Sequence, residues 1–171
     1  MAAQKISVYL GAGTFANRPA SPDVPTGGSA FYYATDTMLL YVYDGSSWHV
    51  TVKHVIAIAV SDEGTSLTAG AGKVTFRMPY AMTLLDIRAS VTVAPTDADL
   101  IVDVNEGGAS ILDSNKLTID ATEKTSTTSS APVGIADDAL ADDAEITIDI
   151  DQIGSTLAGA GLKVYLIGVP A

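Results

Sequence analysis

The chain has 171 residues, of which 47% are hydrophobic and 17% are charged, and its formal net charge is −11. It has no cysteine, which excludes disulfides, thiolate zinc sites and cysteine nucleophiles. Residues 1–60 balance to zero charge, whereas 17 of the 20 acidic residues and six of the nine basic residues follow residue 60. So acidic a surface repels phosphate backbones, and we expect no nucleic-acid partner.

The shift in charge marks a boundary near residues 55–60. We therefore expect two parts, an N-terminal part over residues 1–53 and an acidic domain over residues 54–171; the patterns below identify the first as an arm and small attachment module and the second as a β-sandwich. Alternating apolar residues predict a first strand within residues 1–10. The proline- and glycine-rich segment 11–28 predicts an extended arm without helix or strand. The N-terminus lacks the apolar core of a secretory signal, and no run reaches the roughly 18 apolar residues of a membrane span, so we expect no membrane partner.

Next comes an aromatic stretch that predicts a small β-meander of three strands, SAFYYA, MLLYVY and WHVTV. The turns between them are TDT and DGSS, and Asp-Gly is typical of hairpins. Alternation places large apolar side chains on both faces of this sheet. They are either the core of a tiny domain or a docking surface for a partner. The candidate interface residues are Phe15, Phe31, Tyr33, Tyr41, Tyr43 and Trp48.

Residues 54–171 predict an all-β fold, because about eight short alternating segments are separated by turn-rich stretches. We interpret this pattern as a jelly-roll-like antiparallel β-sandwich. The segment LLDIRASVTV alternates so that Leu85, Ile87 and Ala89 are expected to face inward. The acidic segment ADDALADDAE could form one helical turn.

No catalytic site, cofactor site or metal site is expected, and we expect the protein not to be an enzyme. Nucleophile-elbow, P-loop and dinucleotide motifs are all missing. His49 and His54 are five residues apart, which puts them on opposite faces of a continuous strand. The acids of TDADLIVDVNEGG and EITIDID are either a solvated polar face or, if their strands are neighbours, oxygens that could share a cation. The full calcium-loop pattern is missing.

Two long stretches resemble proteins of tailed bacteriophages. The first stretch is similar to a short module of virion proteins, and its sequence is GTFANRPASPDVPTGGSAFYYATDTMLLYVYDGSSWHV. The similarity lies in T-F-A-x-R-P, in F-Y-x-A-T-D-T and in a later D-G and W. The segment from KVTFRM to KLTIDATEKTS, followed by ADDAEITIDIDQIGSTLAGAGLKVYLIG, resembles a β-sandwich domain of head-fibre, decoration and tail-fibre proteins. The resemblance implies a structural protein of the virion surface, made in the host cytoplasm, and it brings no catalytic residues.

A capsid decoration (cement) protein or short head fibre is favoured over a tail fibre, because the chain is short, begins with Met and lacks heptads or repeats. In this interpretation residues 1–53 dock on the major capsid protein and the sandwich projects outward. The resemblance implies a homo-oligomer, in particular a trimer. The alternative is a tail-fibre or tail-tip component whose sandwich binds a host surface receptor, either a glycan or a protein.

Overall fold

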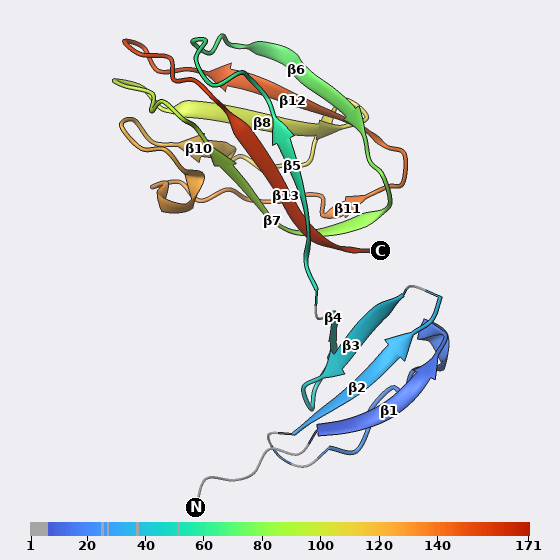
Figure 1. Cartoon of the computed structure of the whole chain (residues 1–171). Coiled ribbons are helices and arrows are strands. Elements are labelled where there is room, and N and C mark those ends of the chain that lie inside the picture. The colour runs from blue at the N-terminus through green and yellow to red at the C-terminus, as the bar shows by residue number, and fades with distance from the viewer. Residues whose placement is uncertain (1–6, 25, 27, 37, 51) are drawn as a thin grey trace, which may run out of the picture. The chain divides into compact units, whose positions relative to one another are not determined.

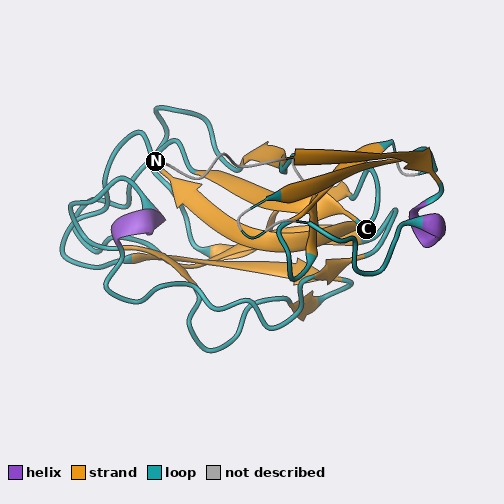
Figure 2. Ribbon diagram, turned by 90° about the horizontal axis from the view of Figure 1, so that it is seen from below, coloured by secondary structure: helices purple, strands orange, loops and turns teal. Residues whose placement is uncertain are grey.

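The computed structural model describes residues 7–24, 26, 28–36, 38–50 and 52–171. The beginning of the strand predicted over residues 1–10 lies outside these described residues. The chain divides into two compact units, 1–53 and 54–171 (Figure 1). Strands dominate both units, and only two short 3-10 turns accompany them in the described parts of the chain (Figure 2). The all-β prediction is therefore confirmed.

The first unit contains a four-stranded sheet in the order β1-β2-β3-β4. Its strands are β1 (Ser7–Gly13), β2 (Ser29–Ala34), β3 (Leu39–Tyr43) and β4 (Trp48–Val50). The last three form the predicted antiparallel meander.

Strand β1 pairs with β2 in parallel and continues through Gly13, so the prediction that segment 11–28 contains no strand is wrong. The register of this pair shifts between Tyr9 and Ala12, and Gly11 there has φ +104°, which glycine adopts without strain.

The second unit is a sandwich of two antiparallel sheets. One sheet has the order β10-β8-β12-β6, with the short β9 on β8, and the other has the order β11-β7-β13-β5. The first sheet contains β6 (Gly70–Arg77), β8 (Leu100–Glu106), β9 (Ala109–Ser110), β10 (Leu117–Ile119) and β12 (Glu145–Gln152). The second contains β5 (His54–Ala59), β7 (Met82–Ser90), β11 (Ala139–Leu140) and β13 (Lys163–Pro170).

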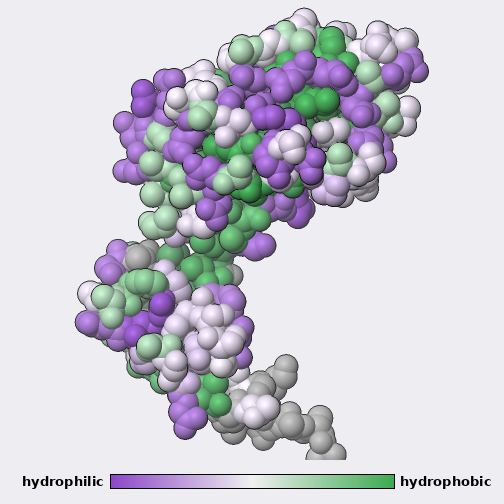
Figure 3. Space-filling model, turned by 180° about the vertical axis from the view of Figure 1, so that it is seen from behind, coloured by the Kyte–Doolittle hydropathy of each residue, from purple (hydrophilic) through white to green (hydrophobic). Residues whose placement is uncertain are grey.

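Successive strands mostly alternate between the two sheets, as in a jelly roll, so the predicted sandwich is confirmed. The core lies between the two sheets, where every second side chain of each strand points inward and meets those of the other sheet. Strand β12 is the clearest case, since Ile146, Ile148 and Ile150 are all buried while the residues between them face outward. Seen from behind, hydrophilic residues cover much of this unit (Figure 3).

Two local predictions for the sandwich are wrong. Leu85 faces solvent, with 49% of its surface exposed, because the pairing of β7 with β13 shifts register beside it and Leu84 is buried instead. A shift of this kind turns one extra side chain outward. The acidic segment predicted to allow a helical turn contains β11, which pairs with Thr83 and Met82 of β7. Its Leu140 is fully buried in the core, and that tertiary contact outweighs local helical propensity.

Candidate functional site

The candidate site is the aromatic sheet of the N-terminal unit, and one of its faces forms an aromatic core. Tyr32, Tyr41 and Tyr43 are buried there, and Trp48 is half-buried beside them. The Trp48 ring lies 5.3 Å from the ring of Tyr43 and 6.4 Å from that of Tyr32, in tilted and edge-on arrangements. These are the geometries that aromatic pairs favour, so this face stabilises the unit itself.

The segment after β1 covers this aromatic core. The ring of Phe15 lies 5.0 Å from that of Tyr41, and the guanidinium carbon of Arg18 lies 3.9 Å from the centre of the Phe15 ring. The same guanidinium is 5.1 Å from Tyr41 and 5.2 Å from Trp48. The indole Nε1–H of Trp48 donates to the carbonyl of Pro19 at 2.9 Å. The predicted arm therefore folds back on its own sheet.

Backbone contacts fix the start of this covering segment. The carboxylate of Asp36 accepts the N–H of Phe15 at 2.8 and 3.1 Å, and the hydroxyl of Tyr32 donates to the carbonyl of Thr14 at 3.2 Å. A side chain on Gly13 would collide with that same hydroxyl. The 3-10 turn η1 (Phe15–Asn17) then brings Phe15 and Arg18 over the sheet. The motif F-A-x-R-P contains both side chains, but its spacing alone does not show that they return to Tyr41 and Trp48.

On the opposite side of the sheet, the two central strands place Phe31, Tyr33, Leu40 and Val42, and we call these four residues the open face. His49 of β4 lies beside Val42 on the same side. Leu40 is 38% exposed, and the other three are half-buried. Phe31 lies opposite Val42 and Tyr33 opposite Leu40 in the β2–β3 register, so the four side chains form one apolar patch. The sulfur of Met38 accepts the Tyr33 hydroxyl at 3.2 Å at the end of this patch.

The six predicted interface residues thus separate into two groups. Phe31 and Tyr33 belong to the open face. The other four, Phe15, Tyr41, Tyr43 and Trp48, belong to the aromatic core or its cover. The role of all six in binding a partner stays a prediction. Arg18 is the functional candidate that sequence reasoning missed in this unit.

The hairpin turn after β3 brings a serine, a histidine and an aspartate together. The Oγ of Ser47 and the Oδ2 of Asp44 lie 2.9 and 2.8 Å from the same nitrogen, Nε2 of His49. A catalytic triad needs its serine and its carboxylate on different imidazole nitrogens, so this arrangement is not one. Asp44 instead holds the turn together, because its carboxylate accepts the N–H groups of Ser47 and Ser46. These hydrogen bonds keep the pKa of Asp44 well below its ordinary value.

The acidic pairs of the sandwich lie on neighbouring strands, since Asp149 of β12 is directly opposite Asp103 of β8. A lysine pairs with the first of these two carboxylates. The Nζ of Lys116 is 2.7 Å from Oδ2 of Asp103, and both side chains are mostly buried. The hydroxyl of Ser110 donates to the other carboxylate oxygen of Asp103 at 2.7 Å. The contacts among Asp103, Ser110 and Lys116 hold the segment between β8 and β10 against β8.

Asp149 and Asp151 do not complete a metal site. Asp149 accepts the N–H of Gly72 at 2.6 Å and the side-chain amide of Asn105 at 3.1 Å. Burial, and then the nearby charge of Asp103, raise the pKa of Asp151. No group of three or more histidine or acidic side chains suited to a metal ion occurs among the residues that the structure describes.

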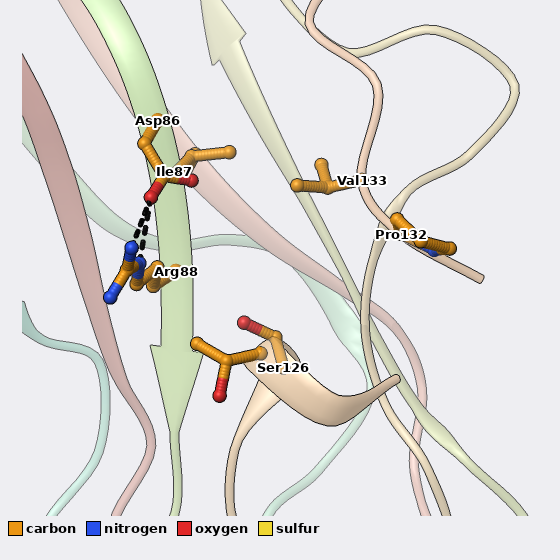
Figure 4. A pocket seen from close by; sticks show the side chains of 7 residues that line it. Asp86, Ile87, Arg88, Ser126, Pro132 and Val133 are labelled. Atoms are coloured by element: carbon orange, nitrogen blue, oxygen red, sulfur yellow. Dashed lines mark hydrogen bonds and ion pairs between the residues drawn. The ribbon is translucent and has the colours of Figure 1, made fainter. Parts of the chain in front are cut away.

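Two shallow hollows mark the sandwich surface. The larger, about 250 Å³, lies between β7 and the segment that carries the 3-10 turn η2 (Ser126–Thr128). The Asp86–Arg88 ion pair forms one wall, and Ser126, Pro132 and Val133 form the other (Figure 4). The second hollow, about 180 Å³, lies beside Leu67 and Lys73. Both are smaller than the roughly 300–1,000 Å³ of typical small-molecule sites.

No family model matches the chain, and no curated protein or solved structure matches it either. Within the described residues, no helix is long and apolar enough to cross a membrane.

Proposed function

We propose that the protein is a structural component of a tailed-phage virion that decorates the outside of the capsid. Its N-terminal unit docks on the major capsid protein, and its acidic sandwich projects outward. The observation that carries the proposal is the open face, a partly exposed apolar patch on a small unit whose other face is covered by Phe15 and Arg18. Exposed apolar patches that are rimmed by polar residues are typical of protein interaction sites.

The distribution of charge supports the same orientation. All of the net charge of −11 arises from residues beyond position 60, whereas the N-terminal unit is balanced. A neutral aromatic unit suits burial against a protein scaffold, because charged residues are depleted and aromatic residues enriched in interface cores. An acidic outer domain keeps neighbouring particles apart by mutual repulsion. The resemblance to virion proteins supplies the capsid as the scaffold.

The alternative function is receptor binding by a tail-fibre or tail-tip component. It would use the sandwich, and the hollow beside Arg88 is the feature that favours it, because Arg88 is an exposed cation on a domain with 17 acidic and six basic residues. The ion pair with Asp86 at 2.7 Å already neutralises that cation. We therefore rank the decoration role first.

The deciding experiment is the copy number of the protein in purified virions, measured by quantitative mass spectrometry against the major capsid protein. A simple ratio of the two proteins supports decoration of the shell. A few copies per particle would place the protein at a vertex or tail and favour the alternative. Absence from the virion would overturn both functions.

Docking itself can be tested with particles that lack the protein and with recombinant chain added back. We expect Phe31→Ser with Leu40→Ser to weaken co-sedimentation with particles at least about 30-fold, the effect of losing a hot spot of about 2 kcal/mol. The matched control is Leu157→Ser, which changes a similarly exposed leucine of the sandwich. Unchanged binding of the double variant, with its Trp48 fluorescence intact, would show that the open face is not the docking surface.

A further inference from the structure

The outer face of the sheet β11-β7-β13-β5 is unusually apolar for so acidic a unit. Val55 of β5 is 56% exposed and lies directly opposite the half-buried Ile167 of β13. Ala57 lies opposite Tyr165 in the next row. The three longer strands run side by side (Figure 1). We call this surface the neutral face, and its apolar side chains are Val55, Ala57, Leu85, Tyr165, Ile167 and Val169. The charged side chains of Asp86, Arg88 and Lys163 lie on the same side of the sheet.

A β-bulge adds an exposed leucine to this surface. The register between β7 and β13 shifts at Ile167 and Gly168, so Leu85 and Asp86 together occupy the position of one residue. Regular alternation would have buried Leu85, yet the bulge turns it outward, where it is 49% exposed. Bulges that re-aim a side chain are typical of functional positions in sheets. The row across the three strands is therefore Val55, Ile167 and Asp86, with the exposed Leu85 beside Asp86 in the bulge.

Charge is almost absent from the same three strands. They carry one acid, Asp86, and two basic residues, Arg88 and Lys163, although the unit as a whole has 17 acids and six bases. Asp86 is ion-paired with Arg88, and Lys163 is ion-paired with Glu63. A copy of this surface is complementary to itself, since it is apolar and its few charges are balanced. Contact through the other surfaces of the unit would bring unbalanced acidic groups together.

Strand β5 also lies at the edge of its sheet, with β13 as its neighbour in the described fold. Edge strands that avoid association usually contain lysine, proline or a bulge. Strand β5 has the sequence HVIAIA, without any of these features. An open edge beside an apolar face gives one continuous surface, and two-fold association uses the same surface on both copies.

We propose that the neutral face is the surface through which the sandwich associates with a second copy of this chain. The partner is identical, and the contact centres on the apolar side chains of Val55, Ile167 and Leu85. The inference goes beyond the proposed function, which names no contact between copies, and it needs no capsid. An assay of mass in solution tests it separately from docking on particles.

The test uses the full chain in multi-angle light scattering coupled to size exclusion, with analytical ultracentrifugation for the affinity. We expect wild type to associate, and we expect added salt to strengthen the association because it screens repulsion between the acidic units. Leu85→Asp should weaken the association at least tenfold, because it sets carboxylates against each other. Leu157→Asp, which changes a leucine of 41% exposure outside the neutral face, should leave it unchanged.

A second measurement covers the case in which Leu85→Asp fails to fold. The chain has no cysteine, so Leu85→Cys introduces a single thiol. We expect a short bis-maleimide to link two such chains covalently, and to link Leu157→Cys chains much less. A wild-type chain that is monomeric up to about 1 mM would overturn the inference. So would a folded Leu85→Asp variant that keeps the full assembled mass, or equal cross-linking at the two positions.

Discussion

Replacement of Phe15 by alanine tests whether the segment after β1 is part of the N-terminal fold. Phe15 is 39% exposed, so roughly 120 Å² of its roughly 200 Å² is buried on the sheet. At about 25 cal/mol per Å² this burial contributes at most about 3 kcal/mol. Alanine retains part of that contact, while the stacking on Tyr41 is lost together with the cation–π contact of Arg18. We expect Phe15→Ala to lower the free energy of unfolding of this unit by about 2–3 kcal/mol.

The effect should be large in relative terms, because a unit of this size has a stability of only about 3–8 kcal/mol. The assay is urea unfolding followed by tryptophan fluorescence, since Trp48 is the one tryptophan of the chain and lies beside Arg18 and Pro19. It therefore reports on the N-terminal unit, whereas far-ultraviolet circular dichroism reports mainly on the larger sandwich.

We expect Phe15→Ala to shift the fluorescence transition to lower urea and to redden the emission of Trp48, while the sandwich transition stays in place. The control is Leu157→Ala, a similarly exposed apolar residue in the other unit, which should leave the fluorescence transition unchanged. If Phe15→Ala and wild type give the same fluorescence transition, the segment does not stabilise the sheet and the interpretation of the covered face is refuted.

Two further predictions concern charged groups. Lys116→Met leaves the mostly buried carboxylate of Asp103 without its cation. We expect this change to lower the free energy of unfolding of the sandwich by about 1–3 kcal/mol, measured by urea unfolding. An unchanged midpoint would mean that the hydrogen bond from Ser110 is enough to stabilise the buried carboxylate. The pKa of Asp44 is lowered by folding, so its contribution to stability is present above its unfolded value of 3.8 and is lost as the pH falls below it. The N-terminal unit should therefore unfold more easily on acidification, and the transition can be followed by Trp48 fluorescence. Asp44→Ala should make the stability of this unit depend less on pH. If wild type and Asp44→Ala are equally sensitive to acid, Asp44 does not stabilise the turn in this way.

The strands could be predicted where one side of a sheet is buried, because burial enforces a period of two. Ile146, Ile148 and Ile150 illustrate this in β12. Leu85 could not be predicted, because a bulge depends on how two strands pair and leaves no mark in the alternation of either strand alone. The same is true of β11, where Leu140 is held by the core and by β7 within an otherwise acidic segment.

The candidate site shows the same limit. Alternation along MLLYVY puts Tyr41 and Tyr43 on one side of the strand and Leu40 and Val42 on the other, which is how the structure has them. It did not show which side is covered, because the cover comes from Phe15 and neighbouring residues through contacts distant in sequence. Prolines and glycines in segment 11–28 exclude a long helix, but they do not show where the segment lies. As a consequence, deletion of residues 1–28 would remove β1 and the cover together, and would test stability rather than docking.

The two apolar surfaces, one on each unit, have a joint consequence if both proposals hold. Self-association through the neutral face would link several open faces in one assembly, and linked sites bind a repetitive surface with far greater avidity than single ones. Leu85→Asp should then lower occupancy on particles although its open face is intact. Changes at Phe31 and Leu40 should lower occupancy without altering the mass in solution. If Leu85→Asp dissociates the assembly but leaves particle occupancy unchanged, each copy docks independently, and self-association serves the outer surface rather than attachment.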